Sequence, residues 1–185
     1  MAIFSNGQTQ LAYEVHGAGF PILLIAPGGL RSERGMWRGS PLNPLAALSD
    51  HFRVIAMDQR NAGESTGPIE SDHDWSTYTQ DQLNLMSHLG HERFAVVGMC
   101  IGGPYILNLL KTAPQRIVAS AVMQTIGRDN NRAEFLTMFD GWAKDLHAQD
   151  PQMYPSGALA GLRRRMFEND QTFMAMSDQV IADFA

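Results

Sequence analysis

The chain has 185 residues, 44% hydrophobic and 18% charged, so it can bury one sizeable core and fits a single domain. Its formal net charge of −5 and isoelectric point of about 5.6 argue against the basic surface that nucleic acids or anionic membranes attract. The most apolar segment, residues 22–26, is far too short to cross a bilayer.

Cysteine usage and the N-terminus indicate the cellular compartment. The single cysteine, Cys100, cannot form an internal disulfide, and residues 1–4 lack the charged and apolar regions of a signal peptide. A reducing, cytoplasmic location is therefore expected. The one basic run, residues 163–165, is interpreted as a solvated helix face.

Residues 1 to about 125 alternate short β-rich runs with helical patterns. This alternation is typical of strand–helix–strand units and a mostly parallel sheet. The first two strands are predicted at residues 3–4 and 11–15, in a hairpin that turns at Asn6-Gly7.

Continuous apolar runs predict the remaining strands, each expected to be buried on both faces. These runs are residues 21–26, 52–57, 94–99 and 117–123. The sequence therefore predicts an α/β fold with a doubly wound, mostly parallel sheet.

Helical patterns lie between the strands and after them. Apolar residues recur at helical intervals from Trp75 to Leu89, and Gly90 offers a stop. After residue 129 strand patterns vanish, and amphipathic helices are predicted over residues 135–146 and 173–184. We divide the chain into a core of six strands, residues 1–128, and a helical lid over the carboxyl edge of the sheet, residues 129–185. The lid methionines are expected to fill core space; lining an adaptable substrate pocket is the alternative.

The chemistry concentrates in residues 98–103 (GMCIGG), between a predicted strand and a predicted helix over residues 102–113. A nucleophile on such a sharp turn needs small neighbours, and Gly98 and Gly102 lie two residues away on either side. The pattern predicts a nucleophile elbow with Cys100 as the nucleophile and with Gly98, Gly102 and Gly103 as support. The helix N-terminus favours negative charge on the sulfur. A small buried core cysteine is the alternative interpretation.

Attack by Cys100 on a carbonyl would create an oxyanion that backbone N–H groups can stabilise. The amide of Ile101, the residue after the nucleophile, is the first expected donor. The second is expected from the loop at residues 27–30, where glycines let the backbone approach the substrate. Gly29 is the predicted donor there, with Leu30 next.

Three segments together resemble the α/β-hydrolase superfamily over about residues 10–125. They are the glycine loop at residues 27–29, residues 58–65 (DQRNAGES) and the elbow. The middle segment is similar to the superfamily's Asp-x-Arg-Gly-x-Gly-x-Ser loop, with Asn61 in place of its first glycine. Asparagine tolerates positive φ better than other non-glycine residues, so this replacement is gentle. The cysteine elbow also resembles dienelactone hydrolases, and its doubled glycine resembles polyhydroxyalkanoate synthases.

The resemblance implies an acid after the seventh strand and a histidine after the eighth, both beyond the lid in chain order. The six histidines of the sequence all precede that point. They are His16, His51, His73, His88, His91 and His147. All six are expected to be surface residues and not the catalytic base. His147 in the lid is the least improbable substitute for the missing catalytic histidine. Asp129, near the position of the acid in some members, is interpreted as a loop or helix-capping residue.

The end of the sequence allows two interpretations. Residues 181–185 are an amphipathic run without a stop signal, and a sheet lacking its last two strands would expose an apolar edge. We therefore expect a fragment, incomplete at its C-terminus, rather than a complete chain that is inert or weakly active.

The expected function is hydrolysis of a carboxylic ester or related acyl bond through a Cys100 acyl-enzyme. An acyltransferase of the same fold and a non-catalytic homologue that binds a small ligand remain alternatives. The expected partner is a small apolar acyl substrate. Binding to nucleic acid or to a membrane is not expected, and assembly into a homo-oligomer is left as an open possibility. No cofactor and no metal are expected, because the sequence has neither a phosphate-binding loop nor ligands at metal spacing.

Overall fold

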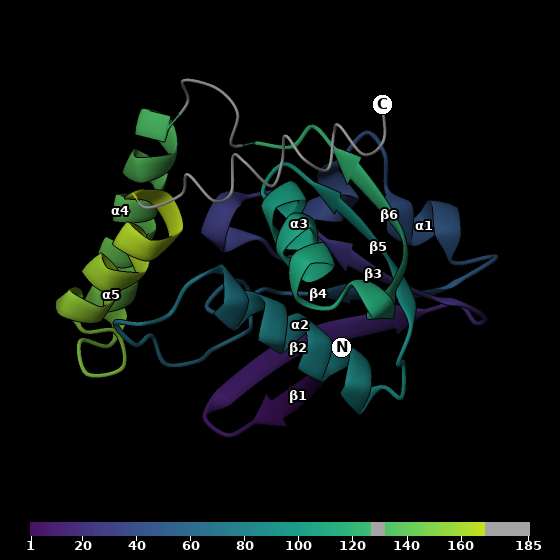
Figure 1. Cartoon of the computed structure of the whole chain (residues 1–185), viewed down its shortest axis with the longest axis horizontal. Helices are drawn as coiled ribbons and strands as arrows, with labels where there is room; N and C mark the ends of the chain where they lie inside the picture. The colour runs from purple at the N-terminus through teal and green to yellow at the C-terminus, as the bar shows by residue number, and fades with distance from the viewer. Residues whose placement is uncertain (127–131, 169–185) are drawn as a thin grey trace.

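The computed structural model describes residues 1–126 and 132–168, and a six-stranded sheet lies at its centre (Figure 1). The strand order is β1-β2-β4-β3-β5-β6. The strands are β1 (Ala2–Asn6), β2 (Thr9–His16), β3 (Pro21–Ile25), β4 (Arg53–Met57), β5 (Phe94–Met99) and β6 (Ile117–Met123). The last four run parallel, and the antiparallel pair β1 and β2 forms one edge. The predicted α/β class with a mostly parallel sheet is confirmed.

Helices cover both faces of this sheet and one end of it. They are the 3₁₀ turns η1 (Gly29–Arg31), η2 (Arg34–Gly39) and η3 (Pro114–Arg116), the helices α1 (Pro44–Leu48), α2 (Trp75–His88), α3 (Gly102–Thr112), α4 (Arg132–Gln149) and α5 (Ser156–Arg163), and a π-helical turn (Arg164–Glu168). In Figure 1, α2 and α3 lie in front of the sheet, α1 lies behind it, and α4 and α5 stand together at one side.

Alternation along β3 explains why its sequence is apolar throughout. Leu23 and Ile25 point into the core that contains α2 and α3, whereas Ile22 and Leu24 point into the core beneath α1 and η2. All five residues of β3 are buried, as a strand with both faces covered requires. The prediction of double burial is therefore confirmed for this strand.

The prediction of double burial fails for β6. Residues 118–122 are exposed, with Val118 at 48% and Val122 at 41%. Within the described part of the chain β6 pairs only with β5 and so lies at an edge of the sheet. An apolar run in the sequence predicts a strand, but the elements that pack against that strand determine how deeply it is buried.

The N-terminal hairpin forms as predicted but turns one residue later. Asn6 pairs with Thr9, so Gly7 and Gln8 are the two loop residues instead of Asn6 and Gly7. Gly7 has φ +60° at the first loop position, where a type II′ turn needs glycine.

Helix α2 occupies the region predicted from Trp75 to Leu89. Asp74 caps its N-terminus: the Asp74 carboxylate accepts from the Ser76 amide at 2.7 Å, and the Asp74 amide donates to Thr77 Oγ1 at 3.3 Å. Gly90, at φ +78°, follows its end.

Helix α4 contains the amphipathic segment predicted over residues 135–146, but α5 was not predicted. The second predicted helix, residues 173–184, lies outside the described residues, as does the boundary expected near residue 129. In the described ranges, no helix is long and apolar enough to span a membrane.

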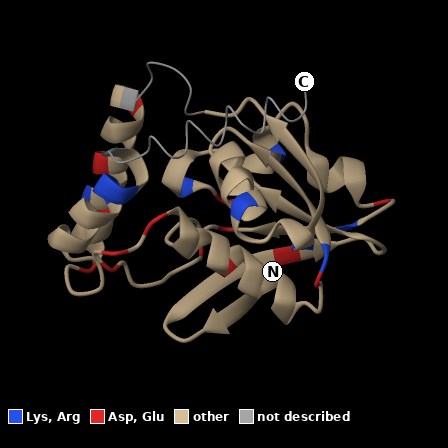
Figure 2. Cartoon of the chain, in the orientation of Figure 1, with Lys and Arg blue, Asp and Glu red and all other residues tan. Residues whose placement is uncertain are grey.

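The basic run at residues 163–165 lies at the junction of α5 and the π-helical turn, and it is visible as the blue band on the helices at the left of Figure 2. Arg163 pairs with Asp140 of α4 at 2.9 Å. Arg165 donates from Nε to the Ser71 carbonyl at 3.2 Å, while Arg164 is exposed. The run was predicted to be a solvated helix face, but two of its arginines make contacts within the protein. One contact joins α5 to α4 within the helical segment that comprises α4, α5 and the π-helical turn, and the other joins this segment to the Ser71 carbonyl.

Candidate active site

The register of the parallel strands brings the predicted site loops to one edge of the sheet. Ile25, the last residue of β3, pairs with Gly98 of β5, and Gly98 pairs with Val122 of β6. The glycine loop after β3 and the elbow after β5 therefore leave the sheet side by side. Ligand sites in such sheets form outside the carboxyl ends of the strands.

Cys100 lies on a sharp turn between β5 and α3, with φ +57°. Its amide donates to the Met123 carbonyl at 3.0 Å, and its own carbonyl accepts from the Gly103 amide at 3.1 Å. A non-glycine residue held in this left-handed region costs roughly 1–3 kcal/mol and occurs where surrounding structure enforces it. Cys100 as a residue is partly exposed. This is the geometry of a nucleophile elbow.

The glycines around Cys100 lie where an added side chain would collide with neighbouring atoms. A Cβ on Gly98 would lie 2.9 Å from the Gly102 oxygen, and a Cβ on Gly102 would lie 2.8 Å from the Ile25 oxygen. A Cβ on Gly103 would lie only 1.9 Å from Thr125 Oγ1. The tight turn therefore depends on three missing side chains.

We expect Gly103→Ala to lower the free energy of unfolding by about 1–3 kcal/mol, because the new methyl group must displace Thr125. Gly157→Ala is the matched control, since a Cβ there meets nothing within 4 Å. The control should be neutral or gain up to about 1 kcal/mol from reduced chain entropy. Urea denaturation of both variants measures the difference, and equal stability would contradict the packing described for Gly103.

The glycine loop after β3 has the shape expected of an oxyanion loop. Gly28 and Gly29 have φ of +114° and +63°, which few side chains tolerate. Ser32 closes the loop by donating from Oγ to the Ala26 carbonyl at 2.7 Å, and the Gln59 amide donates to the Ser32 carbonyl at 3.0 Å. The loop is therefore held by the core and by the segment after β4.

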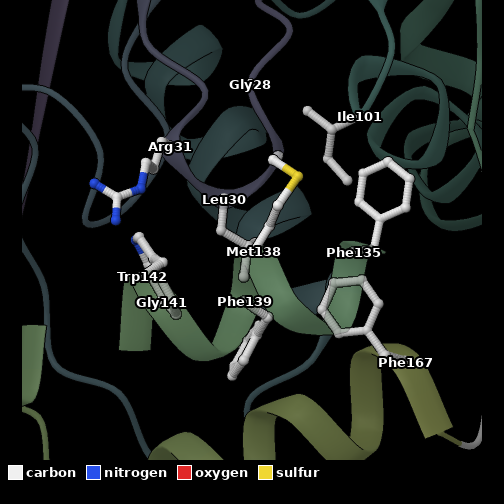
Figure 3. A pocket seen from close by; sticks show the side chains of 11 residues that line it. Gly28, Leu30, Arg31, Ile101, Phe135, Met138, Phe139, Gly141, Trp142 and Phe167 are labelled. Atoms are coloured by element: carbon white, nitrogen blue, oxygen red, sulfur yellow. The ribbon is translucent and has the colours of Figure 1, made fainter. Parts of the chain in front are cut away.

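A cavity of about 270 Å³ joins the two predicted oxyanion donors, because Gly29 and Ile101 both line it (Figure 3). Its other described walls come from the glycine loop, from α4 and from the π-helical turn. They are Gly28, Leu30, Arg31, Phe135, Met138, Phe139, Gly141, Trp142 and Phe167. Cys100 itself is not among these lining residues, although its neighbour Ile101 is. The cavity can accommodate a small apolar group next to the elbow.

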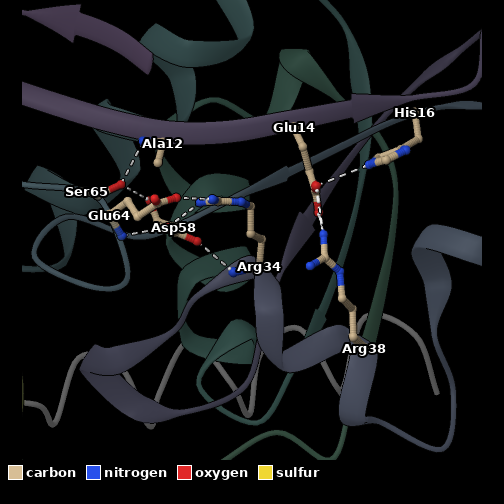
Figure 4. Close-up of polar contacts among 8 residues, drawn as sticks. All are labelled: Ala12, Glu14, His16, Arg34, Arg38, Asp58, Glu64 and Ser65. Atoms are coloured by element: carbon tan, nitrogen blue, oxygen red, sulfur yellow. Dashed lines mark hydrogen bonds and ion pairs between the residues drawn. The ribbon is translucent and has the colours of Figure 1, made fainter. Parts of the chain in front are cut away.

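Asp58 begins the segment after β4 and is almost completely buried. Its carboxylate accepts from the backbone amides of Arg34 at 2.8 Å and Glu64 at 2.9 Å, and the Arg34 guanidinium bridges Asp58 and Glu64 (Figure 4). Burial opposes the charge of Arg34, but hydrogen bonding and attraction to Glu64 and Asp58 outweigh it and raise the pKa of Arg34. Asp58 therefore fixes the loops structurally.

Asn61 anchors the helical segment to the core. At φ +62° it occupies the position that the resemblance gives to glycine. Its side-chain oxygen accepts from the Gly67 amide at 2.8 Å and from the Tyr154 hydroxyl at 3.0 Å. Its backbone carbonyl accepts from Trp142 Nε1 at 3.2 Å. The two hydrogen bonds to the side-chain oxygen are therefore contacts that a glycine in this position could not make.

The six histidines all lie within the described residues, and none forms a hydrogen bond with Cys100 there. His147, the substitute base considered above, bonds through Nδ1 to the Tyr154 carbonyl at 2.9 Å. It lines a different hollow on α4 from the cavity beside Ile101. Burial lowers the pKa of both His73 and His91, with nearby Arg60 and Arg53 adding to the effect.

One predicted residue lies outside the part of the chain that the structure describes, and three residues near the site were not predicted. Asp129 lies outside the described residues. Sequence reasoning missed Arg31 and Trp142 as cavity residues and Tyr154 as an anchor. Only Arg31 had a sequence signal, its position directly after the glycine loop.

Similarity to known sequences covers most of the chain. A protein named "Putative carbamate hydrolase RutD" from Agrobacterium fabrum is 32% identical over 108 residues, which are 57% of this chain and 40% of the relative. Its namesake from Klebsiella pneumoniae (strain 342) is 26% identical over 159 residues, 82% of this chain and 58% of the relative. A soluble epoxide hydrolase from Corynebacterium sp. is 34% identical over 94 residues, 51% of this chain and 30% of the relative. The chain thus spans about 40–58% of the length of these two RutD proteins.

Solved structures share the fold. The enol-lactonase from Burkholderia xenovorans LB400 superposes with a TM-score of 0.61 at 24% identity, covering 95% of this chain and 71% of that chain. A thermophilic esterase from Thermogutta terrifontis gives 0.60 at 22% identity, covering 88% and 70%.

The family model described as alpha/beta hydrolase fold matches residues 21–170. That range holds the glycine loop, the segment after β4, the elbow and α4. The chain therefore belongs to the α/β-hydrolase-fold family.

Proposed function

We propose that this chain supplies the nucleophile and the oxyanion hole of an enzyme that cleaves a carboxylic ester or related acyl bond through a Cys100 acyl-enzyme. The observation that carries the proposal is the strained elbow, which holds Cys100 at φ +57° beside a cavity lined by both Gly29 and Ile101. In this proposal α4 and α5 belong to a lid over the site.

The proposed acylation step needs only groups at the elbow and in the glycine loop. The Cys100 sulfur, after its proton leaves to solvent, attacks the carbonyl carbon and forms a C–S bond. The backbone amides of Ile101 and Gly29 stabilise the resulting oxyanion. As the tetrahedral species collapses, the C–O bond to the leaving alcohol breaks and the alkoxide carries off the electron pair. A thioester on Cys100 remains, and water must then release the acid.

The names of similar proteins support an acyl substrate. Carbamates, esters and enol-lactones, the substrate classes in three of the names above, each have an electrophilic carbonyl carbon. The epoxide hydrolase name points to a different bond, so the comparisons favour an acyl substrate without identifying it.

The proposal is tested by intact-mass measurement after incubation with 4-nitrophenyl acetate. We expect one added acetyl group per chain, and peptide mapping should place it on Cys100. Because the sequence has a single cysteine, no other thiol competes. Absence of any Cys100 adduct would contradict the proposal and favour a non-catalytic ligand-binding homologue.

A competing alcohol separates hydrolysis from acyl transfer. If the acyl group of the Cys100 thioester passes to an added alcohol in preference to water, the protein is an acyltransferase. Release of the free acid alone supports the hydrolase.

A further inference from the structure

The cavity beside the elbow combines apolar walls with one cationic group. Seven of its described lining side chains are aromatic or aliphatic, and Arg31 is the one charged side chain among them. The seven are Leu30, Ile101, Phe135, Met138, Phe139, Trp142 and Phe167. A cation in such a setting suits a substrate that is apolar along its length and anionic at one point.

Arg31 and Ile101, the residue after Cys100, lie on opposite sides of the cavity lining in the view of Figure 3. In Figure 3 the guanidinium points away from Ile101 and toward Trp142, with Met138 between the two sides. Gly29, which is two residues before Arg31, faces the same cavity as Ile101. An acyl group whose carbonyl meets the oxyanion amides would therefore extend its far end toward Arg31.

The present partner of Arg31 can be exchanged. Arg31 Nη2 lies 2.5 Å from the Asp145 carboxylate of α4, but the two side chains are 55% and 68% exposed. Ion pairs this exposed contribute little, because water and salt screen them. A substrate carboxylate arriving through the cavity can therefore replace Asp145, and a guanidinium binds it with two parallel hydrogen bonds.

A second, more polar hollow meets the first at Arg31 and Trp142. It has a volume of about 510 Å³, and Glu33, Asn61 and Asp145 are among the residues that line it. Its carboxylates would repel an anion that moved beyond Arg31. The anionic group is thus confined to the junction of the two hollows.

We propose that Arg31 is a specificity-determining residue that binds a carboxylate at the far end of the acyl group. The favoured substrates are then half-esters of dicarboxylic acids or acyl compounds of equivalent charge. This inference rests on the proposed function, because it takes the carbonyl to lie at Cys100. The competing interpretation makes the Arg31–Asp145 pair a mere tether between η1 and α4.

The test compares acylation of Cys100 by mono-4-nitrophenyl glutarate with acylation by its neutral methyl ester. We expect the wild-type chain to react faster with the anionic ester. Arg31→Met should reduce the ratio of anionic to neutral rates by about tenfold, the effect of one lost charge-assisted contact. Succinate and adipate analogues report which chain length spans the distance from Cys100 to Arg31.

Two further variants separate binding from tethering. Asp145→Asn frees Arg31 and should raise the anionic-to-neutral ratio, whereas a tether predicts that it slows both esters equally. Arg38→Met is the matched control, since Arg38 is also an exposed arginine paired with a carboxylate, Glu14, and lines neither hollow. Its ratio should stay at the wild-type value.

Calorimetry keeps the inference testable if Cys100 does not react. Methyl hydrogen glutarate should bind the wild-type chain more tightly than dimethyl glutarate, and Arg31→Met should remove that difference. Failure of acylation with this binding pattern intact contradicts the proposed function alone. Equal binding of the two esters to the wild-type chain overturns the role of Arg31.

Discussion

Cys100→Ala is expected to abolish acylation by 4-nitrophenyl acetate, with no adduct detectable by intact mass. In the proposed mechanism the Cys100 thiol forms the covalent bond, and an alanine methyl group offers no nucleophile. The free energy of unfolding should change by less than about 1 kcal/mol, because the residue is small and partly exposed. Stopped-flow release of 4-nitrophenolate measures the first effect, and urea denaturation measures the second.

Cys100→Ser provides the matched control for this variant. Serine keeps the size and polarity of the side chain but is a far weaker nucleophile without a base to activate it. We therefore expect slow or undetectable acylation with unchanged stability. If Cys100→Ala still forms the adduct, or loses several kcal/mol of stability, Cys100 is a core residue and not the nucleophile.

The strands and the elbow were predictable because their signals are local. Residues 94–103 contain the strand, the turn and the first helical residues in one continuous segment, and the glycines at the required positions identify the turn. The carboxyl ends of parallel strands lie at the same edge of a sheet, so the loops that follow two such strands are expected to be near each other. The sequence therefore predicts that Gly29 and Ile101, 72 positions apart, lie close together, and both line the same cavity.

Features that depend on long-range packing could not be predicted. Arg31 and Asp145 are separated by 114 positions, and Asn61 and Tyr154 by 93. No local pattern indicates that these pairs meet. The exposure of β6 was missed for a related reason, since the same apolar run fits an edge strand and a central strand.

Apolar periodicity in the sequence predicted helix α4 but not helix α5. The stripe from Phe135 to Leu146 correctly predicted α4, because Phe139, Trp142 and Leu146 are buried against the core. Helix α5 has only eight residues, begins after Pro155 and continues into a π-helical turn. A helix this short contains few turns over which an apolar periodicity can be recognised. Its buried residues Leu159 and Leu162 are equally compatible with a loop that packs two apolar side chains against the core.

With 4-nitrophenyl acetate in excess, the 185-residue chain is expected to release at most one 4-nitrophenolate per Cys100 and then to stall. In the proposed mechanism, acylation needs only the thiol and the oxyanion amides, whereas release of the acid needs a base that activates water. No histidine hydrogen-bonds to Cys100 in the described ranges, and His147 is engaged with the Tyr154 carbonyl. General-base catalysis contributes about 10²–10⁴-fold, so the steady rate should lie at least about 100-fold below the burst.

The stalled species can be identified by its chemistry. Neutral hydroxylamine cleaves a thioester, so adding it after the burst should remove the acetyl mass and permit a second burst of equal size. Mutation of His147 to alanine should leave both bursts unchanged, because the histidine faces a different hollow from the one lined by Ile101. Steady multiple turnover that is lost in Cys100→Ala would show that a base already acts within this chain. A loss of that turnover in His147→Ala would then identify His147 as the base, and α4 would have to rotate to bring it to Cys100.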